Sequence, residues 1–329
     1  MKKIFTTVLA LILLILPLSA CGNKDDLQSL ELNEVTHSVF YAPLYLAIED
    51  GYFEQEGLKI NLTNGGGADN SMTAILSKTA DIGLMGPETV IYVNNQGKQD
   101  LPKVFGQLTQ KDGAFLVSRN PEPDFEWTDL NGKEILAGRK GGVPAMSFEY
   151  LLKELGLTNN QDYTLNFNVQ FNLMTSAFLS GVADYCTVFE PTASEYQAEG
   201  KWHIVSSVGV GSGEIPYTSF IALESFLKEN PKTVKAFLRA IKKAHEFMAT
   251  HTELEVAEKI VKQFPSTTIK SIETAIKSYK SIDAWKTNLQ ATESSFERLQ
   301  NIMENAGELP KRIEFSKLVD NTFAKEVFG

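Results

Sequence analysis

Cysteine is scarce in this chain. Its 329 residues include two cysteines, Cys21 and Cys186, which cannot supply a disulfide framework. The sequence has no Cys/His spacing of the kind that holds zinc, so we expect no metal site and no cofactor. Cys186 stands alone in the apolar run Tyr185–Phe189, where a single thiol is best explained as a small core residue.

Motifs of common catalytic and nucleotide-binding sites are absent as well. The sequence contains no G-x-x-x-x-G-K-[ST], no G-x-S-x-G and no H-E-x-x-H pattern. Of the four histidines, His37 alone falls in a loop that we expect to border a site. A single loop histidine is more often a hydrogen-bonding residue than a base. We therefore expect no catalytic residues and no enzyme activity.

Basic residues are in the minority. Lysine and arginine number 31 against 41 aspartates and glutamates, which gives a net charge of −10. Removal of residues 1–20 would take away Lys2 and Lys3 and change the net charge to −12. Negative charge disfavours nucleic acid and anionic membrane surfaces as partners. We therefore expect no nucleic-acid partner.

The N-terminus has the pattern of an export signal. Lys2 and Lys3 precede the apolar run Val8–Leu16, and small residues follow in Leu18-Ser19-Ala20-Cys21. This pattern is typical of a secretory signal peptide at residues 1–20, and the run is too short for a comfortable membrane span. Cysteine directly after Leu-Ser-Ala resembles a bacterial lipobox. That resemblance implies that Cys21 carries a lipid such as palmitate and holds the protein on the outer face of the cytoplasmic membrane; ordinary secretion is the alternative.

The segment Glu34–Asn61 has the pattern of a strand, a helix and a second strand. Glu34–Val39 is β-like, Pro43 suits the first turn of a helix, and Leu58–Leu62 alternates apolar and polar residues. Ligands gather at the carboxyl ends of strands in open α/β sheets. The polar and aromatic loop at residues 37–41 is therefore a candidate binding loop.

The same pattern continues along the chain in two series. Further strands are predicted at residues 81–85, 103–108, 114–118, 133–137, 163–170, 184–189, 202–208 and 215–223. Residues 209–213 are predicted to form a glycine-rich loop. A helix is expected from Pro231, because Asn-Pro is a helix-start signal, and more helices at about 252–263, 266–280, 292–305 and 315–328.

These series predict two lobes, because the 309 residues that follow a cleaved signal exceed a comfortable single core. Residues 21–32 are expected to form a tether. Lobe 1 would contain residues 33–115 and 218–329, and lobe 2 residues 116–217. The chain would cross between the lobes near 112–118 and 214–220, which leaves a cleft and a hinge that can close around a ligand.

Five segments of the sequence resemble one family. They begin at Glu34, Ala80, Arg139, Phe189 and Ile215 and read E-V-T-H-S-V-F-Y-A-P-L-Y-L-A-I-E-D-G-Y-F-E-Q-E-G-L, A-D-I-G-L-M-G-P-E, R-K-G-G-V-P-A-M-S-F-E-Y-L-L-K-E-L-G-L, F-E-P-T-A-S-E-Y-Q-A-E-G-K and I-P-Y-T-S-F-I-A-L-E-S-F-L-K-E-N-P. The family is that of the substrate-binding lipoproteins of ABC importers, in the subgroup that serves nitrate, sulfonates, taurine and pyrimidine precursors of thiamine.

The resemblance implies an α/β, two-lobed, type II periplasmic-binding-protein fold, with mixed sheets flanked by helices and a two-crossover hinge. It further implies a monomer that captures a small molecule and delivers it to a membrane permease coupled to an ATPase. Yeast-type thiamine-pyrimidine synthases share this fold and carry a cysteine-rich iron motif, which is missing here because Cys186 is alone. An adhesin or sensory lipoprotein without import is a third possibility.

The ligand contacts implied by the resemblance lie in loops at predicted strand ends. They are Phe40, Tyr41, Pro43, Gly67, Ala68, Asp69, Gly86, Pro87, Glu88, Gly142, Val143, Asn172, Glu190 and Tyr217. Each has a structural alternative: the two aromatics can fill the core, the glycines can form turns, and both glutamates can interact with a helix N-terminus instead of a ligand.

The polarity of these loops bears on the ligand. They offer more acids than bases, with Asp69, Glu88, Asp112, Glu190 and Glu214 against Lys111, Arg139 and Lys140. Carboxylates beside aromatic rings suit a flat heterocycle with N–H groups, because stacking supplies contact area and the carboxylate accepts hydrogen bonds. We therefore expect an aminopyrimidine or another nitrogen heterocycle. A sulfonate, taurine or nitrate is the alternative, since helix N-termini also hold anions.

Overall fold

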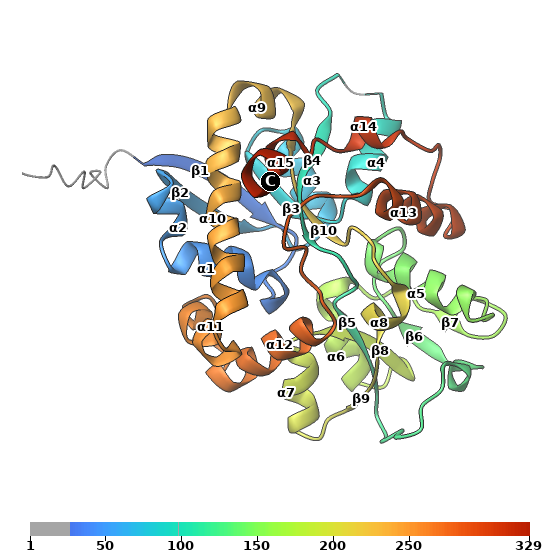
Figure 1. Ribbon diagram of the computed structural model, residues 1–329. Helices are drawn as coiled ribbons and strands as arrows, with labels where there is room; N and C mark the ends of the chain where they lie inside the picture. The colour runs from blue at the N-terminus through green and yellow to red at the C-terminus, as the bar shows by residue number, and fades with distance from the viewer. Residues whose placement is uncertain (1–26, 98) are drawn as a thin grey trace, which may run out of the picture.

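The computed structural model describes residues 27–97 and 99–329, which form two α/β lobes (Figure 1). The predicted signal peptide, Cys21 and residues 21–26 of the predicted tether lie outside the described residues. No helix of the described part is both long and apolar enough to cross a membrane.

The first lobe is built on a five-stranded mixed sheet with the order β2-β1-β3-β10-β4. Strand β1 pairs in parallel with β2 and β3, whereas β10 is antiparallel to β3 and β4. The strands are β1 (Gln28–Glu34), β2 (Leu58–Asn64), β3 (Ile82–Met85), β4 (Pro102–Thr109) and β10 (Thr218–Leu223). Because β10 lies between β3 and β4, the chain returns to the first lobe after building the second.

The second lobe has its own five-stranded mixed sheet, with the order β7-β6-β8-β5-β9. Strand β5 is antiparallel to both β8 and β9, and β6 is parallel to β7 and β8. The strands are β5 (Ala114–Ser118), β6 (Glu134–Leu136), β7 (Thr164–Leu165), β8 (Tyr185–Phe189) and β9 (His203–Ser207). The predicted two-lobed fold with two mixed sheets is confirmed.

Helices cover the two sheets. In the first lobe they are α1 (Ala42–Glu49), α2 (Tyr52–Gln55), α3 (Ala68–Leu76) and α4 (Glu88–Asn95), and in the second α5 (Val143–Glu154), α6 (Met174–Leu179), α7 (Thr192–Ala198) and α8 (Val208–Ser212). The C-terminal helices are α9 (Glu224–Glu229), α10 (Pro231–Thr250), α11 (Glu253–Ile260), α12 (Ile269–Ser281), α13 (Glu293–Asn305), α14 (Phe315–Leu318) and α15 (Thr322–Phe328).

The long helix α10 illustrates how the sequence pattern produces packing. It begins at Pro231, as predicted, and its buried stripe includes Val234, Phe237, Ile241 and Met248. Helix α10 lies against α1, α2 and α15 of the first lobe (Figure 1), as expected for a helix with one apolar face. Helices α12 and α13 reach across instead, α12 to α7 and α13 to α5 of the second lobe.

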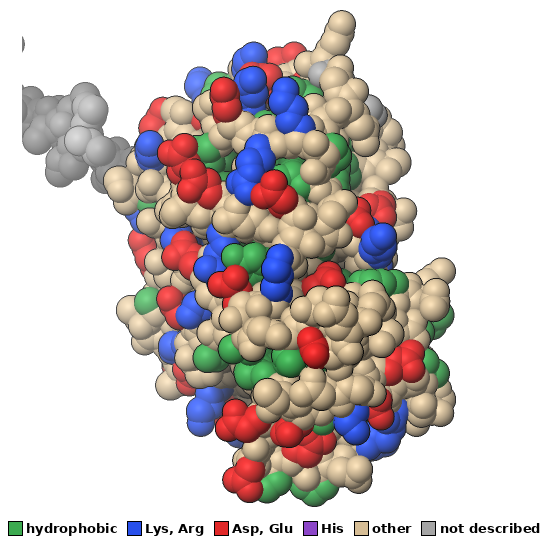
Figure 2. Space-filling model, turned by 90° about the vertical axis from the view of Figure 1, so that its right-hand side faces the viewer, with side chains coloured by type: hydrophobic (Ala, Val, Ile, Leu, Met, Phe, Trp, Pro, Cys, Tyr) green, Lys and Arg blue, Asp and Glu red, His purple; other side chains and the backbone are tan. Residues whose placement is uncertain are grey.

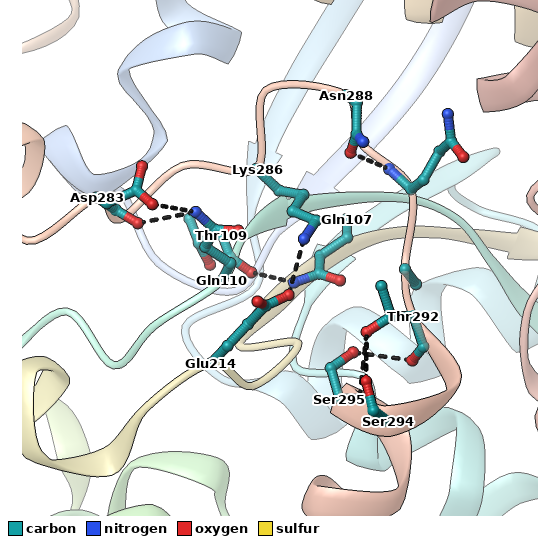
Figure 3. A network of polar contacts seen from close by, with 12 residues as sticks. Gln107, Thr109, Gln110, Glu214, Asp283, Lys286, Asn288, Thr292, Ser294 and Ser295 are labelled. Carbon is teal, nitrogen blue, oxygen red and sulfur yellow. Dashed lines mark hydrogen bonds and ion pairs between the residues drawn. The ribbon is translucent and has the colours of Figure 1, made fainter. Parts of the chain in front are cut away.

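Two crossovers, at residues 110–113 and 213–217, join the lobes, and a C-terminal segment spans both (Figure 3). The side-chain amide of Gln110 on the first crossover donates to the carbonyl and carboxylate oxygens of Asp283, at 3.0 and 2.9 Å. On the second crossover, Glu214 forms a 2.7 Å ion pair with Lys286. The segment 283–289 therefore ties both crossovers to the first lobe.

Several predicted element limits are wrong. Residues 28–32, expected in the tether, lie in β1 and pair with β2, and β1 ends at Glu34 rather than Val39. Residues 163–170 contain a strand of two residues, because β6 offers partners only to Thr164 and Leu165. Ala114 and Phe115 belong to the second sheet rather than to lobe 1, since they pair with Phe189 and Val188.

Two further corrections concern helices. The predicted loop 209–213 is mostly helix α8, and its glycines mark close packing: a Cβ at Gly209 would collide with the carbonyl oxygen of Asp112. The predicted helix 315–328 is broken in two, because the backbone N–H of Asp320 donates to Val104 in β4 at 2.8 Å. In both places a tertiary contact overrides the local pattern.

Candidate ligand-binding site

A cavity of about 400 Å³ lies between the two lobes. Eleven of the fourteen predicted ligand contacts line it: Phe40, Tyr41, Gly67, Ala68, Asp69, Gly86, Glu88, Gly142, Val143, Asn172 and Tyr217. Residues that were not among the predicted contacts complete the wall: Val35, Thr36, Ser38, Gly66, Asn70, Arg139, Pro144, Gln170, Phe171, Phe189 and Thr218. This volume lies within the range typical of small-molecule sites.

Aromatic side chains form one part of the wall. The ring centroid of Phe40 lies 5.8 Å from that of Tyr217 and 6.1 Å from that of Phe189. The ring centroids of Phe171 and Phe189 are 6.0 Å apart. Phe40 and Tyr41 are also part of the hydrophobic core, at 1% and 3% exposure. These two aromatics therefore fill the core of the first lobe and also line the cavity. The strand-end position of Phe189 was the available sequence signal for its place in the wall.

Glu88, the first residue of α4, is the most unusual polar group of the cavity. Its side chain is 2% exposed, and its Oε2 atom has no hydrogen-bond partner among the described residues. Burial raises the pKa of this carboxyl to about 7, although Arg139 and nearby backbone N–H groups oppose the rise. Gly86 provides room for the carboxyl, because a Cβ there would collide with it. Glu88 is therefore poised between its neutral and charged forms near neutral pH.

Arg139 is the one cation of the cavity wall among the described residues, and it is not one of the predicted ligand contacts. It lines the cavity from the second lobe, and its Nη2 atom lies 3.1 Å from Oδ1 of Asp69 on α3 of the first lobe. The Arg139 side chain is 35% exposed and that of Asp69 is 74% exposed. The pair therefore spans the cleft at the edge of the cavity.

Two helix N-termini border the same region. Gly67 precedes α3 and Gly142 precedes α5, and neither can offer a side-chain cap to the first backbone N–H groups of its helix. Both residues line the cavity. The partial positive charge of a helix N-terminus can stabilise an anion or a polar ligand atom.

Three predicted contacts do not line the cavity. Pro43 is buried in the first turn of α1, and Pro87 is the buried N-cap of α4. Glu190 does not line this cavity, and its carboxylate accepts hydrogen bonds from the backbone N–H and the hydroxyl of Ser194, at 3.0 and 2.7 Å. Glu190 borders a neighbouring chamber of about 190 Å³ instead.

Asp112 and Glu214, the other two acids of the predicted site loops, also have partners outside the cavity. Asp112 is fully buried behind the cavity and accepts from the backbone N–H of Ala114 at 2.8 Å and from the hydroxyl of Ser147 at 2.5 Å. Burial raises the pKa of its carboxyl to about 6. Glu214 pairs with Lys286 at the hinge. The cavity itself thus contains Asp69, Glu88 and Arg139 as its charged groups.

Direct contacts join the lobes on both sides of the cavity. The Tyr92 hydroxyl donates to the carbonyl oxygen of Gly141 at 2.9 Å. On the other side, Ser38 donates to the carbonyl oxygen of Glu190 at 3.3 Å, and the Glu190 backbone N–H donates to the Tyr279 hydroxyl at 2.9 Å. The lobes are therefore in contact around the cavity.

The described residues contain no group of three or more histidines, cysteines, aspartates or glutamates placed to hold a metal ion. Cys186 lies buried in β8, outside the cavity wall, and burial raises the pKa of its thiol. Acidic and basic side chains are interspersed over the face shown in Figure 2.

A family model described as NMT1/THI5 like matches residues 39–255, which include most of this cavity wall. The chain belongs to this family. It is 42% identical over 316 residues to the presumed binding protein YtlA of Bacillus subtilis, which covers 96% of this chain and 95% of YtlA. It is 26% identical to the formylaminopyrimidine-binding protein of Halalkalibacterium halodurans, over 75% of this chain and 76% of that protein.

The wider comparison places enzymes and binding proteins on the same scaffold. The chain is 25% identical to the 4-amino-5-hydroxymethyl-2-methylpyrimidine phosphate synthase of Candida albicans, over 67% of this chain and 66% of that enzyme. The structure of the nitrate-binding protein NrtA from Synechocystis superposes with a TM-score of 0.73 at 14% identity, over 92% of this chain and 88% of NrtA. That likeness establishes the periplasmic-binding-protein fold.

Proposed function

We propose that this protein is the solute-binding component of an ABC importer and that its ligand is an aminopyrimidine or another nitrogen heterocycle. It would act outside the cytoplasmic membrane, held by a lipid on Cys21, as a monomer that delivers ligand to a permease and its ATPase. The family, the two-lobed fold and the cavity between the lobes support the transport role. The lobes would divide at residues 110–113 and 213–217.

The buried Glu88 carboxyl carries the proposal for the ligand class. A buried polar atom without a partner is costly, and a ligand N–H group would satisfy the Oε2 atom of Glu88. Aromatic rings of Phe40, Phe171 and Phe189 border the same cavity and supply apolar contact area for a flat ring. The formylaminopyrimidine-binding relative supports the same class of ligand.

Binding is favoured over catalysis by the side chains that line the cavity. Its charged groups are Asp69, Glu88 and Arg139, and its wall holds no cysteine or histidine among the described residues. A nucleophile paired with a base is the arrangement that covalent catalysis requires. The synthase relatives share the scaffold, and the cysteine-rich motif that we expect of such enzymes does not occur in this sequence.

A sulfonate, taurine or nitrate is the second candidate for the ligand. Arg139 and the N-termini of α3 and α5 favour it, because guanidinium and backbone N–H groups bind oxyanions. A small anion would leave the Oε2 atom of Glu88 without a donor, and so we rank it below the heterocycle.

Ligand capture would work by shifting the balance between open and closed lobes. The cavity wall contains residues of both lobes, such as Glu88 and Val143, so a bound molecule bridges them. A ligand shifts such an equilibrium only by its difference in affinity for the two forms. The permease would then recognise the closed form.

A thermal-shift panel tests this proposal on the form of the protein that starts at Gly22. Aminopyrimidines, including formylaminopyrimidine, are compared with purines, flavins, taurine, alkanesulfonates and nitrate. A ligand at about 100 times its dissociation constant stabilises the folded state by about 2.7 kcal/mol. We expect the shift with an aminopyrimidine. Stabilisation by the anions alone would overturn the heterocycle assignment.

A further inference from the structure

The ion pair between Arg139 and Asp69 joins the two lobes at the wall of the cavity. The Nη2 atom of Arg139 lies 3.1 Å from Oδ1 of Asp69, and the two residues come from opposite lobes. Asp69 is 74% exposed, so its carboxylate gives up little solvation in this pair. Exposed ion pairs contribute little stability, and a competing anion can therefore displace Asp69 readily.

The surroundings of Arg139 favour an anion at this position. The N-termini of α3 and α5, helices of nine and twelve residues, face the same cavity, and neither has a side-chain cap. The Asp69 carboxylate balances this positive region. It also occupies the place that an anionic group on a ligand would take.

The buried carboxyl of Glu88 independently points to a ligand in this cavity. Glu88 is 98% buried in the wall of the same cavity, and its Oε2 atom has no partner among the described residues. The charge of Arg139 acts on the Glu88 carboxyl, so the two groups belong to one site. One of them accepts hydrogen bonds and the other only donates them.

We propose that the ligand has two chemically different ends: a nitrogen end with N–H donors that binds Glu88, and an anionic oxygen group that replaces Asp69 on Arg139. This inference rests on the proposed function and narrows the ligand to an amino-substituted heteroaromatic acid. A carboxylate or a phosphate can supply the anionic group. Arg139 then selects among heterocycles, and Asp69 competes with the ligand for it.

Calorimetric titration with matched probes tests the inference. The probes are an aminopyrimidine carboxylate, the same ring with a phosphomethyl group, and the carboxamide of the carboxylate, which keeps the shape and loses the charge. We expect the wild type to bind at least one of the acids about tenfold or more tightly than the carboxamide. The acid that binds more tightly identifies the source of the anionic group. Added salt should weaken acid binding, because ions screen the contact with Arg139.

Substitutions assign this preference to Arg139. Arg139→Gln should abolish the difference between acid and carboxamide, and Asp69→Asn should keep or enlarge it because the competitor is gone. Arg139→Lys should retain part of the difference between acid and carboxamide, since a single ammonium group replaces the planar guanidinium group. Lys140→Gln is the matched control: it removes the neighbouring charge, which pairs with Glu308 rather than with Asp69. It should leave the preference unchanged.

Failure of this inference can be told apart from failure of the proposed function. Equal binding of acid and carboxamide by the wild type, or an unchanged preference in Arg139→Gln, would overturn the two-ended ligand and leave the heterocycle proposal standing. If no aminopyrimidine binds and simple sulfonates do, the proposed function fails and this inference fails with it.

Discussion

Trp285 donates its indole N–H to the carbonyl oxygen of Phe40 at 2.9 Å. Trp285 belongs to the C-terminal segment that ties the two crossovers to the first lobe, and Phe40 lines the cavity. A residue that supports the hinge is thus bonded directly to the loop that we expect to contact the ligand. We therefore expect movement of the hinge and the position of Phe40 to be coupled.

Trp285→Phe should weaken ligand binding. The substitution removes the N–H donor and leaves a buried carbonyl oxygen without a partner, which costs about 1–3 kcal/mol. Urea unfolding gives the change in stability, and titration calorimetry gives the change in affinity. Trp127→Phe, in the second lobe away from the cavity, is the control. Equal affinities of the two variants would argue against the coupling.

Gly113→Ala should disturb the same region from the other side. A Cβ at Gly113 would lie 2.7–2.9 Å from atoms of the Phe40 ring, so the ring or the crossover must shift. Overpacking of this kind costs about 1–3 kcal/mol of stability. Phe40→Leu should relieve the collision, so the double variant should lose less stability than the two single changes together. Strict additivity would contradict direct contact.

The stability of the protein should fall as pH rises through the pKa of His37. Its Nδ1 atom lies 2.5 Å from Oε1 of Glu34 and its Nε2 atom 2.8 Å from the carbonyl oxygen of Gln263, so both ring nitrogens face acceptors and both must carry protons. The Tyr45 hydroxyl donates to the other Glu34 oxygen at 2.6 Å. Burial lowers the pKa of His37, but the Glu34 carboxylate outweighs it and the net shift is upward.

Because the folded pKa of His37 is raised, its contribution is complete below the unfolded value of about 6.5 and is lost above the folded value. His37→Gln should therefore lower Tm more at pH 6 than at pH 9. His203→Gln, in β9, should not reproduce this difference. A constant loss of Tm across this range would contradict the protonated state of His37.

The charged form of Glu88 should destabilise the protein, whereas the charged form of His37 stabilises it. Its folded pKa of about 7 lies above the unfolded value, so stability is fully present below about 4.5 and declines as pH rises through 7. Glu88→Gln should remove this decline, with a gain on the order of 3 kcal/mol at most at pH 8. Urea unfolding at pH 5 and pH 8 measures it; parallel losses in the variant and the wild type would refute the raised pKa.

Local sequence signals predicted the loops of the site better than the roles of individual side chains. Glu88 follows Pro87 and Glu190 precedes Pro191, and both lie at helix starts, yet Glu88 faces the cavity while Glu190 accepts from Ser194. The serine four residues after Glu190 was the available clue. No comparable signal reveals that Arg139 reaches Asp69, because that contact depends on how the lobes pack.

In the fold, too, local sequence signals predict some features, and tertiary contacts determine others. The two lobes and most strands follow from short-range alternation and turn residues, and the covered face of α10 follows from its spacing. The helix break at Val319 does not, because it arises from pairing with Val104 in another part of the chain. The sequence pattern predicts a loop at Gly209 and Gly211, whereas in the structure their lack of a side chain permits close contact with Asp112 and Leu151.

The most direct test of the ligand assignment is the affinity of formylaminopyrimidine and simple aminopyrimidines for the wild type, Glu88→Gln and the control Glu54→Gln, which changes an exposed residue of α2. Calorimetry at pH 7.5 should give tight binding to the wild type and the control, and at least tenfold weaker binding to Glu88→Gln, because an amide offers a weaker acceptor to ligand N–H groups. Unchanged affinity in Glu88→Gln would contradict recognition of a nitrogen heterocycle by this carboxyl.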